Sequence, residues 1–436
     1  MTTNTTPNLR RAESPAEGKV LDVQQTSCCV VGGGPAGAVL ALMLARKGIA
    51  VTLLEAHGDF DRDFRGDTLH PSVMENMAEL GLADRLLQLR HSKLPAITFE
   101  FGGVSVAFAD FRLLKTDFPY ITMMPQTTFL EFITAEAGRY PNFRLAMGAS
   151  ARELIEEDGA IRGLRYRSRD GLHEVRAALT VGADGRFSRV RRLAGFEPVK
   201  TSAPMDALWF HLPRSPDEPD VDIARISGGR IGILLNRGDL WQAGYIIPKG
   251  GYQQLRAGGM EKLRRSLADL RPEVADRVGH LREWGQISVL SVESDRLPKW
   301  YRPGLLMIGD AAHVMSPVAG VGINYAIQDA VAAANVLGDR LKEGKVRTRD
   351  LARVQRRREW PTRVIQGLQA QLQQRVLAPA LAPALNPTKA FAPPGFMSFL
   401  PRVPVLRKLP PRLIGFGIWP VHVKNGRVGD AVDPPG

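Results

Sequence analysis

Apolar and polar positions fall into blocks that predict alternating strands and helices. Cys28–Val31 is a continuous apolar run, as expected of a strand buried on both faces of a parallel sheet. Ala38–Lys47 is rich in helix-forming residues, and Gly48 follows it as a C′ glycine. Ala50–Leu54 is a second apolar strand and ends at Glu55. This part of the chain therefore predicts a strand, a turn, a helix and a second strand.

The same region contains a stretch that could be mistaken for a membrane span. Thr26–Ala45 is long enough to cross a bilayer and carries no charge. Its middle, residues 32–37, reads GGGPAG and would break a helix where lipid offers the backbone no hydrogen-bond partner. We therefore expect no transmembrane segment.

Later blocks predict a second kind of architecture. Pro95–Phe111 and Ala207–Ile247 alternate apolar with small or polar residues, which is typical of antiparallel strands, and the second block has glycine turns at 228–229 and 238–239. Leu179–Arg192 and Gly304–Ala330 each read as an apolar strand, a loop and a helix, and Leu351–Leu377 is helical in character.

Composition limits the class of protein. The chain has 436 residues, of which 44% are hydrophobic and 24% charged, so it is too long for one core and is neither disordered, collagen-like nor a coiled coil. Its two cysteines, Cys28 and Cys29, are adjacent and cannot form an ordinary disulfide, which fits a reducing cytoplasm. Residues 1–25 are polar, contain no signal-peptide stretch and are expected to be a disordered arm.

The net charge of +13 is concentrated near one end. Residues 351–436 contain 13 Lys and Arg against 3 Asp and Glu. Bulky apolar residues are mixed with the basic ones after Phe391, so this tail is either a weak membrane-surface anchor or a segment packed on the body with its charges in solvent. No nucleic-acid recognition motif accompanies the charge, so nucleic acid is not expected as a partner.

The first turn carries recognisable chemistry. Gly32, Gly34 and Gly37 match G-x-G-x-x-G between a strand and a helix, with Pro35 and Ala36 in the turn. The first glycine permits the tight turn, the second lets the backbone approach a pyrophosphate, and the third allows helix and strand to pack closely. Glu55 is placed to accept hydrogen bonds from an adenosine ribose, which disfavours NADP. The turn predicts binding of FAD or NAD without deciding between them.

Two later motifs place an acid and a glycine where a strand ends. They are Asp184-Gly185, followed by Ser188, and Gly309-Asp310, followed by the loop at Gly320–Asn324. Open α/β sheets bind ligands at this edge. Each motif alone could equally be an acidic turn that caps a helix.

Together and in this order the motifs resemble those of the group A flavin-dependent aromatic monooxygenases, the p-hydroxybenzoate hydroxylase-like family, over about residues 26–340. The resemblance implies FAD as cofactor and NAD(P)H as a co-substrate that binds transiently, without a nicotinamide domain of its own. It implies that Asp310 holds the ribityl chain, that Asp184-Gly185 lies near the pyrophosphate and serves NAD(P)H use, and that Pro317 lies beside substrate. The loop residues implied to face the isoalloxazine are Gly320, Gly322, Ile323 and Asn324, and further contacts are implied for Arg65 and Gln126.

The resemblance also implies the reaction. NAD(P)H reduces the flavin, O2 adds to give a C4a-hydroperoxide, and one oxygen atom is inserted into an aromatic or quinone-like small molecule. The chemistry is centred on the flavin, so no side chain is assigned as catalytic, and no metal motif is present. Candidate wall residues of the substrate site, for each of which ordinary sheet packing is the alternative, are Phe210, His211, Arg225, Trp241 and Tyr245.

The predicted fold is α/β, with a Rossmann-like FAD-binding domain, an interleaved antiparallel-sheet substrate domain and a C-terminal helical and irregular tail. Two alternatives stay open: a flavin oxidoreductase of this fold without oxygen insertion, and a non-catalytic flavin-binding protein that docks on membranes.

The expected location is the cytoplasm, with peripheral membrane contact through the tail. The predicted parts are the arm 1–25, the FAD-binding segments 26–94, 112–200 and 299–345, the substrate-domain segments 95–111 and 201–298, and the helix and basic Pro-rich tail 346–436.

Overall fold

A computed structural model describes the greater part of the chain. The described residues are 18–61, 67–101, 104–215, 217–218, 223–382, 395, 399, 403–404 and 406–424. Arg65, which the family resemblance implicates in FAD binding, lies outside them.

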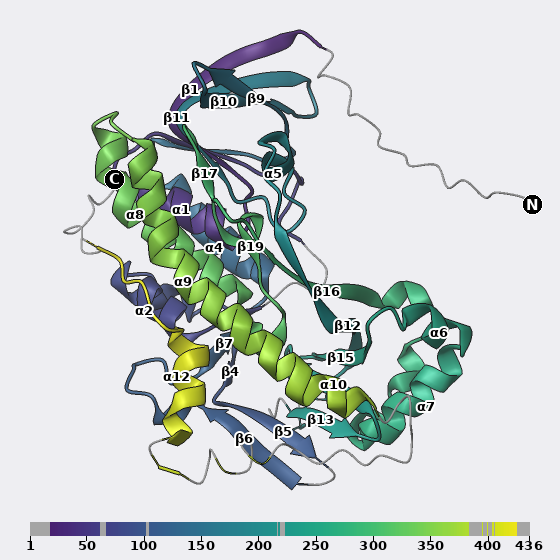
Figure 1. Ribbon diagram of the computed structural model, residues 1–436. Helices are drawn as coiled ribbons and strands as arrows, with labels where there is room; N and C mark the ends of the chain where they lie inside the picture. The colour runs from purple at the N-terminus through teal and green to yellow at the C-terminus, as the bar shows by residue number, and fades with distance from the viewer. Residues whose placement is uncertain are drawn as a thin grey trace, which may run out of the picture.

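A first sheet forms the upper part of the molecule (Figure 1). Its centre is parallel, because β1 pairs with β2 on one side and with β11 on the other, and β8 and β18 continue the sheet in the same direction. α1 packs against both α4 and α8 over a core that includes both cysteines. The elements are β1 (Val20–Val31), α1 (Pro35–Arg46), β2 (Val51–Leu54), α4 (Gln126–Gly138), β8 (Phe143–Ala146), β9 (Ser150–Glu157), β10 (Ala160–Arg167), β11 (Leu172–Gly182), α5 (Arg189–Leu193), β17 (Tyr301–Arg302), β18 (Leu305–Met307) and α8 (Gly322–Lys342).

A second, eight-stranded sheet unites segments that are far apart in sequence. Its order is β19-β16-β12-β15-β14-β13-β5-β6, and it is antiparallel except where β13 meets β5. The hairpin glycines Gly228 and Gly229 both have positive φ, which confirms the predicted turn. The strands are β5 (Ala96–Phe101), β6 (Val104–Asp110), β12 (Val199–Pro213), β13 (Ile223–Ser227), β14 (Arg230–Asn236), β15 (Leu240–Pro248), β16 (Ser288–Arg296) and β19 (His313–Val314).

Short elements connect the two sheets and cover them. α6 (Tyr252–Ala257) and α7 (Met260–Leu270) cover one face of the second sheet. A three-stranded sheet of β3 (Thr68–Leu69), β7 (Ile121–Met123) and β4 (Ser92–Leu94) accompanies α2 (Pro71–Glu79) and α3 (Ala83–Leu86).

The C-terminal region is helical and lies along the body. α9 (Thr348–Leu372) packs on α8 and runs the length of the molecule toward α10 (Ala378–Leu381), while α12 (Leu409–Phe416) packs on α2 and β6 (Figure 1). The mixed α/β architecture with its helical C-terminal region confirms the predicted fold class. No helix among the described residues is long and apolar enough to cross a membrane.

The predicted arm needs a correction. We expected residues 1–25 to be disordered, but β1 begins at Val20, and Val20–Gln25 pairs with β11. This end of β1 is largely exposed, so its polar side chains meet solvent while its backbone is hydrogen-bonded in the sheet.

Candidate active site

The three glycines of the first turn have three different environments. Gly32 has φ +105°, and a β-carbon there would lie 2.5 Å from the carbonyl oxygen of Ala183. A β-carbon at Gly37 would lie 1.9 Å from the carbonyl oxygen of Gly32. At Gly34, the N-cap of α1, a β-carbon would meet no atom within 4 Å. The open backbone at Gly34 therefore fits the approach of a pyrophosphate, and the other two glycines build the turn.

Glu55 ties the end of β2 to this turn. Its carboxylate is buried and accepts hydrogen bonds from the backbone N–H of Gly33 at 2.8 Å and of His57 at 3.0 Å. The Nδ1 atom of His57 lies 2.7 Å from the same carboxylate. The acid therefore sits at the carboxyl end of its strand, where the fingerprint expects it.

The Asp184-Gly185 turn lies directly against the first one. The Asp184 carboxylate accepts hydrogen bonds from the backbone N–H groups of Arg189 at 2.7 Å and Val190 at 3.0 Å, as well as from the Ser188 hydroxyl. Burial raises the pKa of Asp184 above its usual range, although these donors oppose the shift. The carboxylate caps α5, so the capping role considered for this acid is present.

The Gly309-Asp310 turn sits where two helices meet. Gly309 has φ +59°, and a β-carbon there would lie 3.1 Å from Cβ of Ala36 in α1 and 3.2 Å from Cβ of Ala326 in α8. Its N–H donates to Asp329 over 3.0 Å. The partly buried Asp310 therefore stands beside the N-terminus of α1.

The loop before α8 is fastened to β3. Asn324 accepts a hydrogen bond from the backbone N–H of His70 at 2.8 Å and donates to the carbonyl of Thr68 at 3.3 Å. The Thr68 hydroxyl donates to the carbonyl of Gly320 at 2.9 Å.

Within this loop, Ala319 and Gly320 both have positive φ. Gly322 and Ile323 are half-buried in the first turn of α8, and Pro317 is exposed at the start of the loop.

A partly buried ion pair joins this region to the second sheet. Asp67, just before β3, accepts a hydrogen bond from the N–H of Gln126 at 3.2 Å and pairs with Arg237 at 2.9 Å. Arg237 also donates to Gln242 at 2.8 Å. Burial raises the pKa of Asp67, while Arg237 opposes the rise. Neither Asp67 nor Arg237 was predicted from the sequence as a site residue. The position of Arg237 beside the Gly238 turn could have pointed to it.

The second sheet presents two different faces. Leu208, Phe210 and Leu212 of β12 share one face with Trp241 and Tyr245, and this face packs beneath α7. Ala207, Trp209 and His211 point to the opposite side, because successive residues of a strand alternate.

Trp209 and Ile233 belong to the same apolar cluster as Val318, which lies in the loop before α8. The face bearing Trp209 is therefore the one turned toward the Gly309–Asn324 region.

This geometry divides the expected substrate-wall residues between the two faces. Phe210, Trp241 and Tyr245 belong to the packing beneath α7, where the Tyr245 hydroxyl lies 2.8 Å from that of Ser266. Arg225 forms ion pairs with Glu100 at 3.0 Å and Glu273 at 2.9 Å on the same side. Of the five expected wall residues only His211 lies on the face turned toward the loop, and Trp209 and Gln242 share that face with it.

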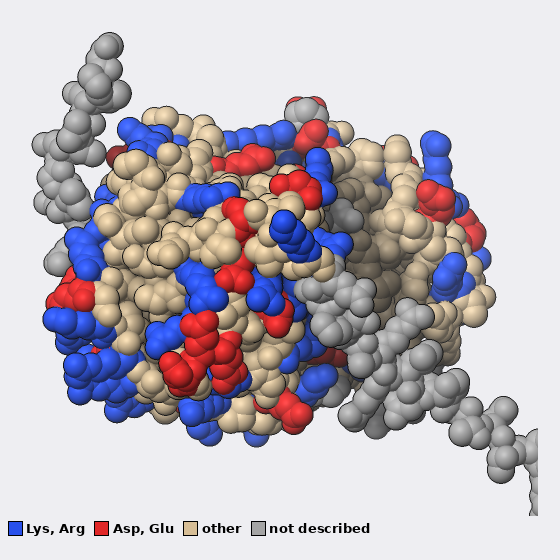
Figure 2. All heavy atoms as spheres, turned by 90° about the horizontal axis from the view of Figure 1, so that it is seen from above, with Lys and Arg blue, Asp and Glu red and all other residues tan. Residues whose placement is uncertain are grey.

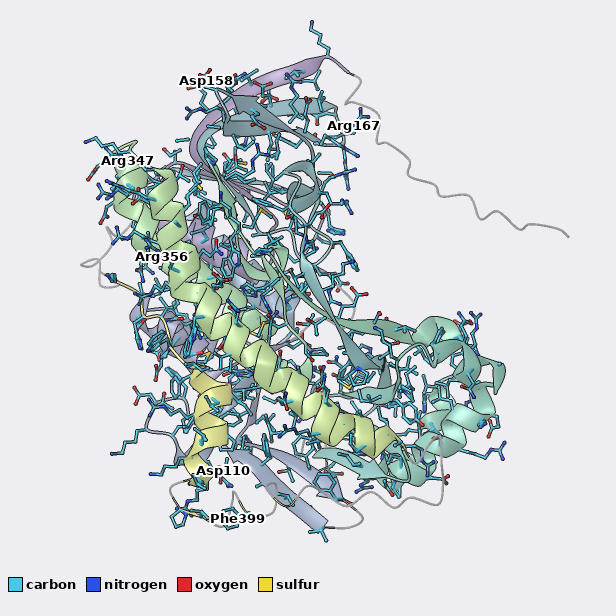
Figure 3. The ribbon with its side chains drawn as sticks, in the orientation of Figure 1. Asp110, Asp158, Arg167, Arg347, Arg356 and Phe399 are labelled. Carbon is cyan, nitrogen blue, oxygen red and sulfur yellow. The ribbon has the colours of Figure 1, made fainter. Side chains whose placement is uncertain are left out.

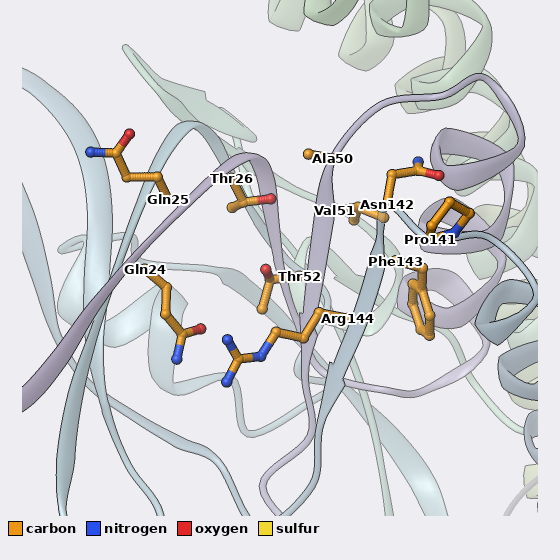
Figure 4. A pocket seen from close by; sticks show the side chains of 10 residues that line it. All are labelled: Gln24, Gln25, Thr26, Ala50, Val51, Thr52, Pro141, Asn142, Phe143 and Arg144. Atoms are coloured by element: carbon orange, nitrogen blue, oxygen red, sulfur yellow. The ribbon is translucent and has the colours of Figure 1, made fainter.

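A separate hollow lies on the first sheet. It is drawn in Figure 4, has a volume of about 200 Å³, and lies beside the middle of β1 and the amino ends of β2 and β8, where it includes Thr52 and Arg144. It is at the wrong end of the strands for a Rossmann-type ligand. Within the described part of the chain no cluster of His, Cys, Asp and Glu could hold a metal ion.

Comparisons with known proteins agree with the geometry. The model of a family described as FAD binding domain matches residues 25–367. The chain is 36% identical over 347 residues, covering 79% of this chain and 81% of the relative, to 6-methylpretetramide 4-monooxygenase of Streptomyces rimosus. The structure of OxyS anhydrotetracycline hydroxylase from Streptomyces rimosus superimposes with a TM-score of 0.71 at 22% identity, covering 90% of this chain and 76% of that one.

A second solved structure has the same fold. It is pqsL, a probable FAD-dependent monooxygenase from Pseudomonas aeruginosa, with a TM-score of 0.71 at 21% identity, covering 83% of this chain and all of that one. The relatives support oxygen insertion over the alternatives of an oxidoreductase without it or a non-catalytic flavoprotein. The chain belongs to this FAD-binding family and is an FAD-dependent aromatic monooxygenase.

Proposed function

We propose that the enzyme hydroxylates a phenolic compound of several fused rings. The observation that carries this proposal is the 36% identity, over 81% of its length, to an enzyme named for a pretetramide substrate. The proposed binding surface is the sheet face bearing Trp209, His211 and Gln242, opposite the loop that contains Val318. An indole face and apolar neighbours suit flat aromatic rings, and the polar side chains suit phenolic oxygens.

The residues around the turns fit FAD. The N–H groups at Gly34 and the start of α1 would hold the pyrophosphate, Glu55 the adenosine ribose and Asp310 the ribityl chain. Gln126, at the start of α4 beside Asp67, is a further proposed contact. When bound, FAD supplies the redox chemistry that accepts electrons from NAD(P)H, typical of this family, and activates O2.

The chain itself would orient and shield the reactants. The backbone N–H groups of Gly322, Ile323 and Asn324 stand at the N-terminus of α8, where they favour negative charge. The N–H of Gly320, just before them, donates to the carbonyl of Pro317 at 3.0 Å and shapes the loop. Asn324 and Thr68 hold that loop against β3, so its N–H groups are fixed before substrate arrives. Val318 packs in the same cluster as Trp209, so Val318 and the preceding Pro317 would exclude water from the proposed substrate surface.

Asp184 is proposed to act on NAD(P)H through the shape of its turn. Its carboxylate is already engaged by α5, the backbone of Ala183 and Asp184 lies against Gly32, and Gly185 follows with φ +78°. A cytoplasmic location also remains a proposal; its support is the pair of free, buried cysteines.

The function can be tested with purified protein. NAD(P)H oxidation should be stimulated by polycyclic phenols more than by single-ring phenols, and the product should carry one atom of ¹⁸O from labelled O2. Stimulation without label in the product would contradict hydroxylation. Stimulation only by single-ring phenols would contradict the proposed substrate class and leave the monooxygenase assignment intact.

A further inference from the structure

The outer face of α9 is strongly basic. Its inner face packs on α8, so the helical repeat leaves one side of α9 in solvent. We call this side the α9 outer face; its exposed residues include Arg353, Arg356, Arg357, Trp360, Arg363 and Leu368. Figure 3 marks Arg356 on this helix, and Figure 2 shows Lys and Arg gathered on the left, the side where the turn between α8 and α9 lies in Figure 1.

The chain after α12 adds a second tryptophan to this face. The rings of Trp360 and Trp419 lie 5.0 Å apart between centroids, yet 50% of Trp360 and 64% of Trp419 remain exposed. The chain next to Trp419 is anchored to the body, because Val421 is buried and its carbonyl accepts a hydrogen bond from Asn76 at 2.8 Å. The two indoles are therefore a fixed feature of the surface.

More exposed apolar and basic side chains lie on α12, which leads into Trp419. Leu409 and Arg412 are both exposed there. Two arginines of the α9 outer face are offset by acids of the same helix: Arg353 lies 3.9 Å from Asp350 and Arg363 lies 3.8 Å from Glu359. Arg356 and Arg357 add their charge to that of Arg412. The exposed surface around the indole pair thus combines indoles and leucines with an excess of arginines.

We propose that this surface docks on an anionic lipid membrane. Indoles prefer the boundary between headgroups and acyl chains, and arginines beside them attract anionic headgroups while their stems contact apolar groups. A second copy of the chain would bring the same positive charge to the contact, so charge complementarity favours the lipid surface. A nucleic acid would leave Leu368 and Leu409 without apolar partners.

The proposal goes beyond the tail considered in the sequence analysis and beyond the enzymatic function. Within the basic region 351–436, it assigns the membrane contact to a defined surface, the α9 outer face together with Trp419. The contact would be peripheral and would bring the enzyme to compounds that partition into lipid, whatever its substrate.

The test uses the full-length holoenzyme and sedimentation with vesicles. Vesicles of equal parts phosphatidylcholine and phosphatidylglycerol should carry the protein down at low salt, pure phosphatidylcholine should not, and added salt should release it. Arg356→Glu with Arg357→Glu should weaken binding at least about tenfold, and Trp360→Ser with Trp419→Ser about tenfold. The matched control is Arg256→Glu with Arg265→Glu, two exposed cations on α6 and α7, which should bind like wild type.

Three outcomes would overturn the proposal. One is a wild-type protein that stays in solution with both kinds of vesicle. Another is an equal loss in the control and in the α9 variants, since net charge alone would then explain binding. The third is evidence that the surface binds something else. In that case the α9 variants would change the oligomeric mass or the binding to single-stranded DNA, while vesicle binding would stay unchanged.

Discussion

Arg358 of α9 donates a hydrogen bond from Nε to the Oδ1 atom of Asp329 of α8 over 2.7 Å, and both side chains are completely buried. The other oxygen of Asp329 accepts from the backbone N–H of Gly309 at 3.0 Å and lies 2.6 Å from Nε2 of His313. Burial alone would raise the pKa of Asp329, but His313 and Arg358 outweigh it and hold the pKa below its usual range. One carboxylate thus ties α9 to the turn that carries Asp310.

Breaking this pair should loosen both the fold and the cofactor site. Arg358→Met leaves the Asp329 charge buried without its main partner and should lower the free energy of unfolding by about 3–5 kcal/mol. Because Asp329 also holds Gly309, FAD should dissociate more readily from whatever protein folds. Denaturant titrations with and without added FAD measure both effects. The double variant Arg358→Met with Asp329→Asn removes the unpaired charge and should recover part of the stability; no recovery would contradict the electrostatic cause.

The first turn offers a pair of glycine variants that separates binding from folding. Gly34→Ala places its β-carbon in open space, so the apoprotein should keep its melting temperature. FAD affinity should fall at least about tenfold, or about 1.4 kcal/mol, because the backbone approach is blocked. Gly37→Ala instead forces a contact of 1.9 Å with Gly32 and should destabilise the apoprotein itself. Equal FAD affinity in wild type and Gly34→Ala would argue against a pyrophosphate at this turn.

The burial of His70 leads us to expect that the folded protein loses stability in acid. It is completely buried, its Nδ1 lies 2.7 Å from the carbonyl of Ile414 in α12, and burial lowers its pKa from 6.5 to about 4. Between these two values the unfolded chain binds a proton that the folded chain does not. Stability contributed by neutral His70 is therefore present above pH 6.5 and is lost as the pH falls toward 4.

This contribution can be measured by comparing two proteins at two pH values. Wild type should lose about 2 kcal/mol of unfolding free energy from this group between pH 7 and pH 5. His70→Gln has no such titration, so its loss over the same range should be smaller by that amount. Identical pH dependence of the two proteins would mean that His70 is not buried in its neutral form.

The glycine turns were predictable because their chemistry depends on short-range order. A strand, three spaced glycines and a terminal acid are adjacent in sequence, and Gly32, Gly34 and Gly37 took the three environments that the pattern requires. Arg358 was overlooked within a run of three arginines, although Leu351, Val354 and Ile365 lie on the same helical face and mark its position as buried. Its partner Asp329 is on another helix, which no local pattern specifies.

The face that would bind substrate could not be predicted from the sequence, for a different reason. Both faces of the second sheet are covered, by α7 on one side and, on the other, by Val318 together with residues 372–381 at the end of α9 and in α10. Aromatic residues therefore occur on both faces, and an aromatic side chain in the sequence does not indicate on which face of the sheet it lies. A one-residue difference separates Phe210, beneath α7, from Trp209 and His211 on the opposite face.

A matched pair of glycines tests which face binds substrate. A β-carbon at Gly244 of β15 would lie 2.8 Å from the ring of Trp209, so Gly244→Ala should displace that indole. If the face bearing Trp209 binds the aromatic substrate, the KM of a polycyclic phenol should rise about tenfold, since small misplacements at a binding surface are costly. A β-carbon at Gly232 of β14 would lie 2.9 Å from Leu270 of α7 on the opposite face. Gly232→Ala should therefore cost comparable stability but leave KM near the wild-type value, and a rise in KM for Gly232→Ala alone would place the substrate on the α7 side.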